Sequence, residues 1–212
     1  MKKILLLGDS IRLGYDKYVK MALKDVAEVY YPEENCRFVM YLFRRLHEWK
    51  NELECGDDID VVHWNAGLWD DLILLDGKYL TSIELYKEYV DRTCGMIKIL
   101  FPNAKIIFAT STPVQEELFT GECKRFNKDT EEYNRVAIEI VKKHGGEIND
   151  LYSLAKNAPA EYHSDLTHYY TKEGTRLLTN QVLTCLEEAL GVKGKTLDYD
   201  ALFAETENVL GI

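Results

Sequence analysis

The chain has 212 residues, of which 46 % are hydrophobic and 29 % are charged, a composition typical of a soluble globular protein and unlike that of disordered, collagen-like or membrane proteins. Its 26 basic and 36 acidic side chains give a net charge of −10, the wrong sign for a protein that binds nucleic-acid phosphates. We therefore expect a single α/β domain of ordinary size and no nucleic-acid partner.

The N-terminus begins like a signal peptide, but the polar segment from Gly8 interrupts the apolar run that ends at Leu7. An export signal needs roughly 7–15 apolar residues, and no run elsewhere approaches the roughly 18–20 residues that cross a bilayer. The five cysteines are widely spread and include no CxxC pair. We therefore expect neither a disulfide framework nor a zinc site. We expect a cytoplasmic protein without a membrane partner.

Five apolar or β-branched runs predict five strands, at Lys3–Leu7, Val26–Tyr31, Asp60–Trp64, Ala104–Ala109 and Glu147–Asn149. Segments with helical periodicity alternate with them, at Phe38–Trp49, Ile83–Ile97, Tyr133–Ile140 and Leu178–Leu190. Strands that are apolar throughout are typical of a parallel sheet covered by helices on both faces. The predicted fold class is α/β, a three-layer α/β/α sandwich with right-handed crossovers.

Helix-terminal residues support this division of the chain. Thr171 is placed to cap the last long helix, and Gly145-Gly146 ends the helix that starts near Thr130. Residues 1–192 are expected to form one domain. The acidic, partly apolar tail 193–212 is expected to form a short helix packed on the body or on a second subunit, so a homodimer is one of our expectations.

Ligands of an open parallel sheet bind beyond the carboxyl ends of the strands. Gly8-Asp9-Ser10 follows the first strand, a polar segment from Asn65 to Asp70 follows the third, and His163–His168 lies shortly before the last long helix. Each is polar, and the first two contain glycine. These segments are therefore the places to look for chemistry.

One residue of each kind needed for nucleophilic acyl transfer stands at these positions. Ser10 is the candidate nucleophile, His168 the candidate base, and Asp165 lies three residues before His168, so one short turn can hold both. The backbone N–H of Ser10 and the side-chain amide of Asn65 are candidate donors to the oxyanion. The sequence therefore predicts a serine-based acyl-transfer site.

These segments resemble the conserved blocks of the SGNH or GDSL hydrolases. Gly8-Asp9-Ser10 matches the first block, Asp165-Leu166-Thr167-His168 the last, and the order of blocks agrees across roughly residues 3 to 190. The resemblance implies a flavodoxin-like five-stranded parallel sheet and a serine esterase or acylhydrolase, with Ser10 as nucleophile, His168 as base and Asp165 as its orienting partner. Three further segments are most similar to members related to carbohydrate O-acetyl esterases: Asn65–Asp70, Thr112–Val114 and Asp150–Tyr152.

The middle blocks depart from the family pattern. The second block of the family supplies a glycine N–H to the oxyanion site, whereas this chain has Asn35-Cys36-Arg37; Cys36 is our candidate donor, with its neighbours left open. The third block is usually Gly-x-Asn-Asp, and here Trp69 stands at the asparagine position while Asn65 precedes Gly67 by two residues. We favour Asn65 because Trp69 offers only an indole N–H and needs a large pocket.

The candidate substrate-binding residues are Asp9, Arg37, Gly67 and Trp69. Arg12 and Arg37 would suit an anionic substrate, with structural ion pairs as the alternative. An aromatic rim would suit a sugar ring, or else would cover the hydrophobic layer beneath it; its members are Trp69, Tyr162, Tyr169 and Tyr170. His63, inside the third strand, is expected to be a core histidine bonded to a neighbour.

These observations predict a serine-dependent ester hydrolase that removes a small acyl group, acetyl by preference, from a carbohydrate or another small ester, without cofactor or metal. A non-catalytic binding protein on the same fold is one alternative, motivated by Cys36 and Trp69. A metal-dependent phosphoesterase is the other, with Asp9, Asp165 and His168 as its ligands.

Overall fold

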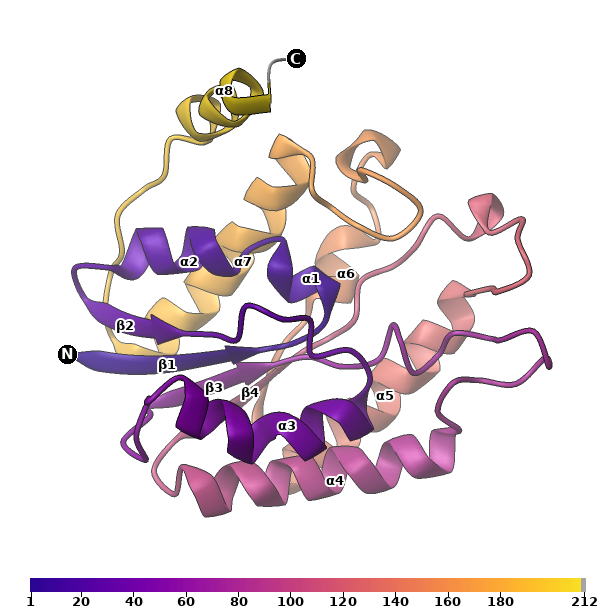
Figure 1. Cartoon of the computed structure of the whole chain (residues 1–212), viewed down its shortest axis with the longest axis horizontal. Helices are drawn as coiled ribbons and strands as arrows, with labels where there is room; N and C mark the ends of the chain where they lie inside the picture. Colours follow the sequence, from indigo (N-terminus) through magenta and orange to yellow (C-terminus); the bar gives the residue numbers. More distant parts are fainter. Residues whose placement is uncertain (211–212) are drawn as a thin grey trace.

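The computed structural model describes residues 1–210 and the side chains of residues 1–204 (Figure 1). Its sheet has five parallel strands in the order β2-β1-β3-β4-β5. The strands are β1 Lys2–Leu7, β2 Ala27–Tyr30, β3 Val61–Trp64, β4 Lys105–Ala109 and β5 Glu147–Asn149. The five strands and their parallel arrangement confirm the prediction from the sequence.

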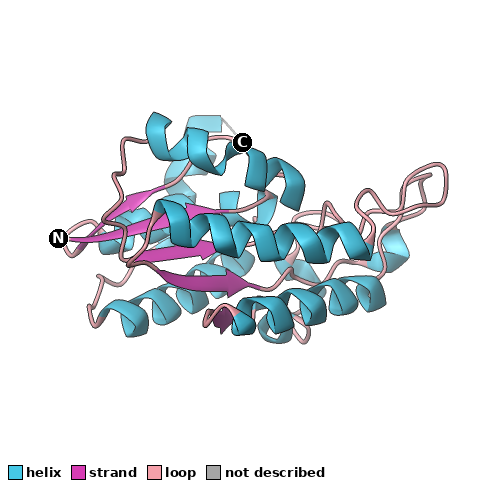
Figure 2. Cartoon of the chain, turned by 90° about the horizontal axis from the view of Figure 1, so that it is seen from below, coloured by secondary structure: helices cyan, strands magenta, loops and turns pink. Residues whose placement is uncertain are grey.

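Helices cover both faces of the sheet (Figure 2). One face carries α3 (Val39–Glu52), α4 (Ile83–Leu100) and α5 (Asn127–Lys143), and the other carries α1 (Ser10–Leu13), α2 (Asp16–Leu23), α6 (Leu151–Ala155) and α7 (Lys172–Leu190). Alternate residues of β1 enter different cores: Leu5 and Leu7 pack with α3 and α4, whereas Ile4 and Leu6 pack with α2 and α7. The molecule is therefore the three-layer α/β/α sandwich that we predicted.

The first crossover contains two helices, α1 and α2, that the strand and helix assignments from the sequence omit. Its apolar positions do carry helical spacing, because Tyr15, Tyr18, Val19, Ala22 and Leu23 are all buried. Helix α5 begins at Asn127, slightly before the predicted start near Thr130. Two short 3₁₀ helices, Glu116–Leu118 and Ala160–Tyr162, lie in the loops beyond β4 and α6.

The ends of the last long helix follow the expected capping chemistry. The Thr171 hydroxyl accepts the Gly174 N–H at 3.1 Å, and Gly191 ends α7 in the left-handed region at φ 65°. Beyond it lies α8 (Tyr199–Leu210), at the end of the chain in Figure 1. Its Phe203 ring stacks on Tyr18 with the ring centroids 6.0 Å apart, so α8 packs on the body of its own chain. Residues 211–212 of the predicted tail lie outside the described residues.

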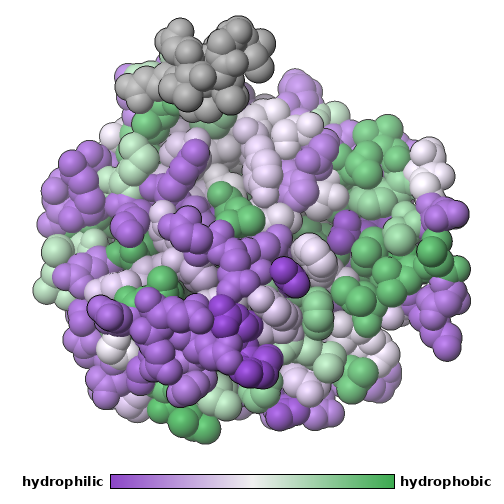
Figure 3. All heavy atoms as spheres, viewed as in Figure 1, coloured by the Kyte–Doolittle hydropathy of each residue, from purple (hydrophilic) through white to green (hydrophobic). Residues whose placement is uncertain are grey.

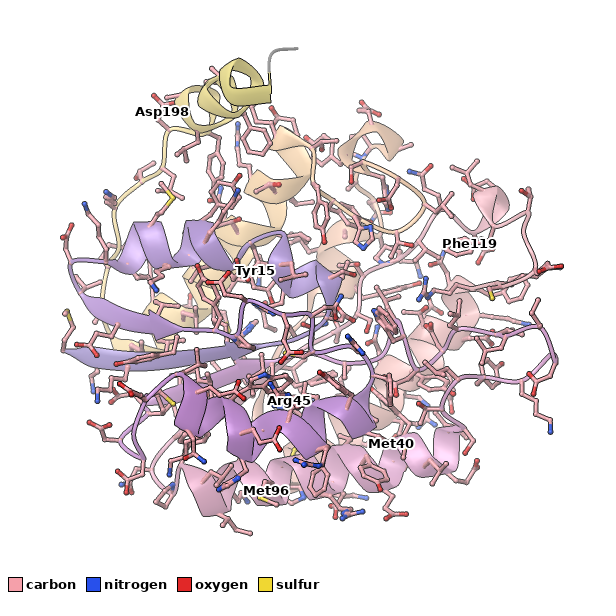
Figure 4. The ribbon with its side chains drawn as sticks, in the orientation of Figure 1. Tyr15, Met40, Arg45, Met96, Phe119 and Asp198 are labelled. Carbon is pink, nitrogen blue, oxygen red and sulfur yellow. The ribbon has the colours of Figure 1, made fainter. Side chains whose placement is uncertain are left out.

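Polar side chains gather over α3, as the space-filling view shows (Figure 3). Arg45, labelled in Figure 4, bonds Glu34 at 2.7 Å and also pairs with Glu48 and Glu52. Glu34 belongs to the loop after β2, so these ion pairs attach that loop to α3. No helix within residues 1–210 combines the length and the hydrophobicity of a membrane-spanning segment.

Candidate active site

The nucleophile turn lies where β1 ends and α1 begins. Leu7 ends the strand and Ser10 starts the helix, so only Gly8 and Asp9 form the turn between them. A Cβ atom at Gly8 would lie 1.9 Å from Asn65 Oδ1, the side chain that follows the adjacent strand β3. Glycine is therefore required at this position because the Asn65 amide packs directly against the backbone.

Three side chains from the two ends of the chain form a continuous hydrogen-bonded triad. Ser10 Oγ lies 2.7 Å from His168 Nε2, and His168 Nδ1 lies 2.7 Å from Asp165 Oδ2. A carboxylate accepts only, so Nδ1 carries the ring proton of the neutral imidazole, and Nε2 is left to accept the proton of Ser10 Oγ–H. The arrangement has the connectivity of nucleophile, base and orienting acid.

The loop geometry of Asp165 explains why the Asp-x-x-His spacing works. Its Oδ1 accepts the backbone N–H groups of Thr167 at 2.7 Å and His168 at 2.8 Å, which leaves Oδ2 for the imidazole. Burial raises the pKa of the Asp165 carboxyl, but these hydrogen bonds outweigh it and hold the pKa below its usual range. The carboxylate is therefore charged at neutral pH and fixes the ring orientation.

Two groups beside Ser10 can donate to an oxyanion. Within residues 1–210 the Ser10 N–H, at the start of α1, has no acceptor in the protein. The Asn65 side-chain amide donates one of its two N–H groups to Asp9 Oδ1 at 2.9 Å, and the side chain is 1 % exposed. Asp9 connects these two candidate donors, because it directly precedes Ser10 and accepts from Asn65.

Cys36 and Asp9 do not lie where the sequence led us to expect. The Cys36 N–H donates to the Gly8 carbonyl at 3.0 Å, so it is not free to bind an oxyanion. The Arg37 N–H is also used, by Asn35 Oδ1 at 2.7 Å. Asp9, expected to contact substrate, has no exposed surface and accepts from Asn65 and from the Ile11 N–H instead. Its role is to cap α1 and orient Asn65.

The two arginines considered for an anionic substrate occupy different environments. Arg12 is fully buried and donates to Asp16 at 2.5 Å and to the carbonyls of Pro32 at 2.8 Å and Glu34 at 2.6 Å. It therefore anchors the loop after β2, which is the structural alternative. Arg37 is exposed, with its guanidinium 4.7 Å from the Tyr41 ring centroid.

The segment after β3 places Gly67 and Trp69 differently. Gly67 is buried at φ 152°, and a Cβ atom there would lie 2.4 Å from Ser111 Oγ. Its backbone therefore packs against Ser111, and it does not face a substrate as we expected. Trp69 is half-buried. Asp70 accepts the Val39 N–H at 3.1 Å and so caps the N-terminus of α3, although it lies 31 residues further along the chain.

A buried acidic cluster, Asp9, Asp70 and Asp71, lies under this segment and was not predicted as a unit. Burial raises the pKa of Asp70 to about 8 and that of Asp71 to about 7. Arg125 pairs with Asp71 at 3.4 Å and donates to the Leu68 carbonyl. The sequence does carry a signal for this cluster, because Asp70 and Asp71 are adjacent within an otherwise apolar stretch. It carries no signal that Arg125 is their partner, because Arg125 comes from a distant loop.

The remaining histidines and aromatic residues divide between core and site. His63 is fully buried and bonds Asn149 at 3.1 Å, which confirms the prediction of a core histidine. Tyr169 is also buried, so it covers the layer beneath, whereas Tyr170 is 38 % exposed beside His168. Among the described residues, no group of three histidine, cysteine or acidic side chains is arranged to hold a metal ion.

No family model and no curated protein matches this chain. Solved structures do match it. A lipase/acylhydrolase from Enterococcus faecalis superposes with a TM-score of 0.70 at 21 % identity, over 93 % of this chain and 100 % of that one. A GDSL-like lipase from Parabacteroides merdae gives 0.69 at 18 % identity, over 91 % and 96 %.

An acetyl-xylooligosaccharide esterase from Geobacillus, in a mutant form, gives a TM-score of 0.65 at 19 % identity, over 86 % of this chain and 93 % of that one. At these identities the superpositions establish the fold. The chain therefore has the fold of the GDSL or SGNH hydrolases, which the blocks around Ser10 and His168 predicted.

Proposed function

We propose that the protein is a serine-dependent ester hydrolase that removes a small acyl group, acetyl by preference, from a carbohydrate or another small ester. The observation that carries the proposal is the hydrogen-bonded chain from Ser10 through His168 to Asp165, with both distances at 2.7 Å. Among the superposed structures, the one from Geobacillus is an acetyl-xylooligosaccharide esterase, which supports the choice of acyl group and of a sugar alcohol.

The geometry supports acylation as the first step. Ser10 Oγ attacks the ester carbonyl carbon while its proton passes to His168 Nε2. The Ser10 N–H and the second N–H of the Asn65 amide would donate to the carbonyl oxygen as it becomes negative. When the tetrahedral intermediate collapses, the imidazolium gives its proton to the departing alkoxide, and the acyl group stays on Ser10.

Hydrolysis of the acyl-enzyme uses the same groups in the opposite direction. Water attacks the acyl carbon and passes one proton to His168 Nε2, and the same two donors hold the oxyanion. The bond to Ser10 Oγ then breaks, Ser10 regains its proton from the imidazolium, and the carboxylic acid leaves. Throughout, Asp165 stays charged and stabilises the imidazolium.

Turnover of a graded set of esters tests this function. We expect p-nitrophenyl acetate to be hydrolysed faster than the butyrate and octanoate esters, and acetate to be released from acetylated xylo-oligosaccharides. Ser10→Ala should remove both activities, whereas Ser153→Ala, which changes an exposed serine bonded to Asp150, should leave them intact.

Three outcomes would overturn the proposal or part of it. Equal activity of Ser10→Ala and the wild type would remove the serine mechanism. Faster turnover of the octanoate ester would replace the acetyl preference with a lipase-like one. Loss of activity in EDTA together with turnover of p-nitrophenyl phosphate would favour a metal-dependent phosphoesterase instead.

A further inference from the structure

Tyr170 follows His168 by two residues and contacts both members of the proposed catalytic pair. Its side chain is 38 % exposed, unlike the neighbouring Tyr169, which is buried in the core. Tyr170 does not take part in the acylation or hydrolysis steps proposed for Ser10, His168 and Asp165.

The Tyr170 ring lies against the imidazole of His168. The two ring centroids are 4.7 Å apart, and the planes differ by 22°, so the rings are stacked. His168 becomes positively charged whenever it holds the Ser10 proton, and the face of an aromatic ring attracts a cation. The contact therefore limits the orientations of the imidazole and places an aromatic face against the ring that takes up the Ser10 proton.

The Tyr170 hydroxyl holds the backbone at the nucleophile. It donates to the Ser10 carbonyl at 2.5 Å. In a regular α-helix that carbonyl would accept the Gly14 N–H, but α1 has only four residues and the Gly14 N–H bonds Ile11 O at 3.2 Å. Burial raises the pKa of Tyr170 to about 12, so the hydroxyl keeps its proton at neutral pH. Tyr170 thus replaces a missing helical hydrogen bond.

Gly14 provides the space in which the ring sits. Its φ of −70° is ordinary for any residue, so the backbone does not require glycine. A Cβ atom at Gly14 would, however, lie 2.8 Å from Tyr170 Cε1 and 2.9 Å from Cδ1. A side chain at this position would therefore displace the Tyr170 ring.

We propose that Tyr170 is a positioning residue that holds the His168 imidazole and the Ser10 backbone in the geometry needed for proton transfer. The absence of a side chain at Gly14 leaves the space that the Tyr170 ring occupies. The proposal rests on the serine hydrolase function proposed above. It differs from the alternative in which Tyr170 stacks on a sugar substrate, because a positioning residue acts on kcat and a stacking residue acts on KM.

A double-mutant cycle between positions 14 and 170 tests this role. With p-nitrophenyl acetate, Tyr170→Leu should lower kcat about tenfold with little change in KM, and Tyr170→Phe, which keeps the ring, should lower it about threefold. Gly14→Ala should lower kcat about fivefold in the wild-type background and less than about twofold in the Tyr170→Leu background, because the ring that carries its effect is gone.

Two controls complete the experiment. Tyr79→Leu, which truncates a tyrosine that is 39 % exposed and contacts Tyr133, should leave kcat unchanged. The NMR signals of the His168 ring protons, recorded at a pH where the ring is neutral, should shift in Tyr170→Leu and stay close to their wild-type positions in Tyr170→Phe, because a stacked aromatic ring shields them. This second measurement does not depend on activity.

The results that overturn the inference are distinct from those that overturn the hydrolase function. Unchanged kcat on p-nitrophenyl acetate in Tyr170→Leu, with a rise in KM for an acetylated xylo-oligosaccharide, would make Tyr170 a substrate-binding residue. Equal effects of Gly14→Ala in both backgrounds would mean that Gly14 does not act through the ring. If His168 ring signals do not respond to Tyr170→Leu, the contact itself is absent. A wild-type protein inactive on every ester would instead contradict the hydrolase function.

Discussion

The Asn65 side-chain amide donates to Asp9 Oδ1 at 2.9 Å, so the residue before the proposed nucleophile orients the proposed oxyanion donor, which directly follows the neighbouring strand β3. The same Asp9 oxygen accepts the Ile11 N–H at 2.9 Å and so caps α1. One buried carboxylate therefore ties the end of β1, the end of β3 and the start of the helix that carries Ser10. This explains why the aspartate of the Gly-Asp-Ser turn is fully buried instead of facing a substrate.

The first prediction separates Asn65 from Trp69 as the oxyanion donor. Asn65→Ala should lower kcat by about 10² to 10³ because an N–H aimed at the developing charge is lost, while KM changes little. Trp69→Ala should alter kcat by less than about threefold, since its indole is only half-buried. Steady-state kinetics with p-nitrophenyl acetate measure both. The reverse result, with Trp69→Ala the severe variant, would show that the competing alignment of the third block is correct.

A second prediction concerns the charge of Asp165. In Asp165→Asn the side-chain oxygen can still accept the N–H groups of Thr167 and His168, so the turn should persist. The amide NH₂ would then face His168 Nδ1 and favour the tautomer whose Nε2 carries a proton and cannot accept the Ser10 proton. We expect kcat to fall by a factor of about 10³ to 10⁴, as in other serine triads. Wild-type kcat in this variant would show that Asp165 does not set the tautomer.

Asp71, in the buried acidic cluster, should make the free energy of unfolding depend on pH. Burial raises the pKa of Asp71 to about 7 in the folded state, whereas an unfolded chain gives about 3.9. The folded protein thus binds the proton more tightly, and folding stability falls as the pH rises between these values. In Asp71→Asn this cost is absent. We therefore subtract the free energy of unfolding of the wild type from that of Asp71→Asn. This difference should be larger at about pH 8 than at about pH 4, by on the order of 2–4 kcal/mol.

Urea unfolding at several pH values measures this difference. Asp57→Asn, at an exposed aspartate, is the control and should show no pH-dependent difference from the wild type. A constant offset between Asp71→Asn and the wild type from about pH 4 to about pH 8 would contradict the raised pKa, since only a group that titrates in this range changes the slope.

The sequence predicted the sheet and the Asp165–His168 pair because both depend on local patterns, and it predicted that Ser10 joins them because all three follow strands or precede a helix at the same edge of a parallel sheet. Strands buried on both faces are apolar throughout, so β1, β3 and β4 stand out as runs. The relationship between Asp165 and His168 is also local, because one turn places the carboxylate beside the imidazole. The sequence prediction omits α2 although its apolar spacing is regular, because its eight residues give only about two helical turns of that pattern.

The parts that were not predicted depend on contacts between distant segments. The Cys36 N–H is lost to the oxyanion site because the loop after β2 docks on the Gly8 carbonyl, and no pattern in the loop encodes that contact. Arg12 binds the same loop from inside, so it does not face a substrate. The partnership of Arg125 with Asp71 likewise depends on how two loops beyond the sheet meet.

Covalent capture of the nucleophile tests the central claim most directly. The protein is incubated with a fluorophosphonate, digested, and mapped by mass spectrometry. We predict one adduct, on the peptide that contains Ser10, with labelling slowed strongly in His168→Ala because the base that activates Ser10 Oγ is absent. An unlabelled Ser10 in a folded protein, or equal labelling of the wild type and His168→Ala, would contradict the account.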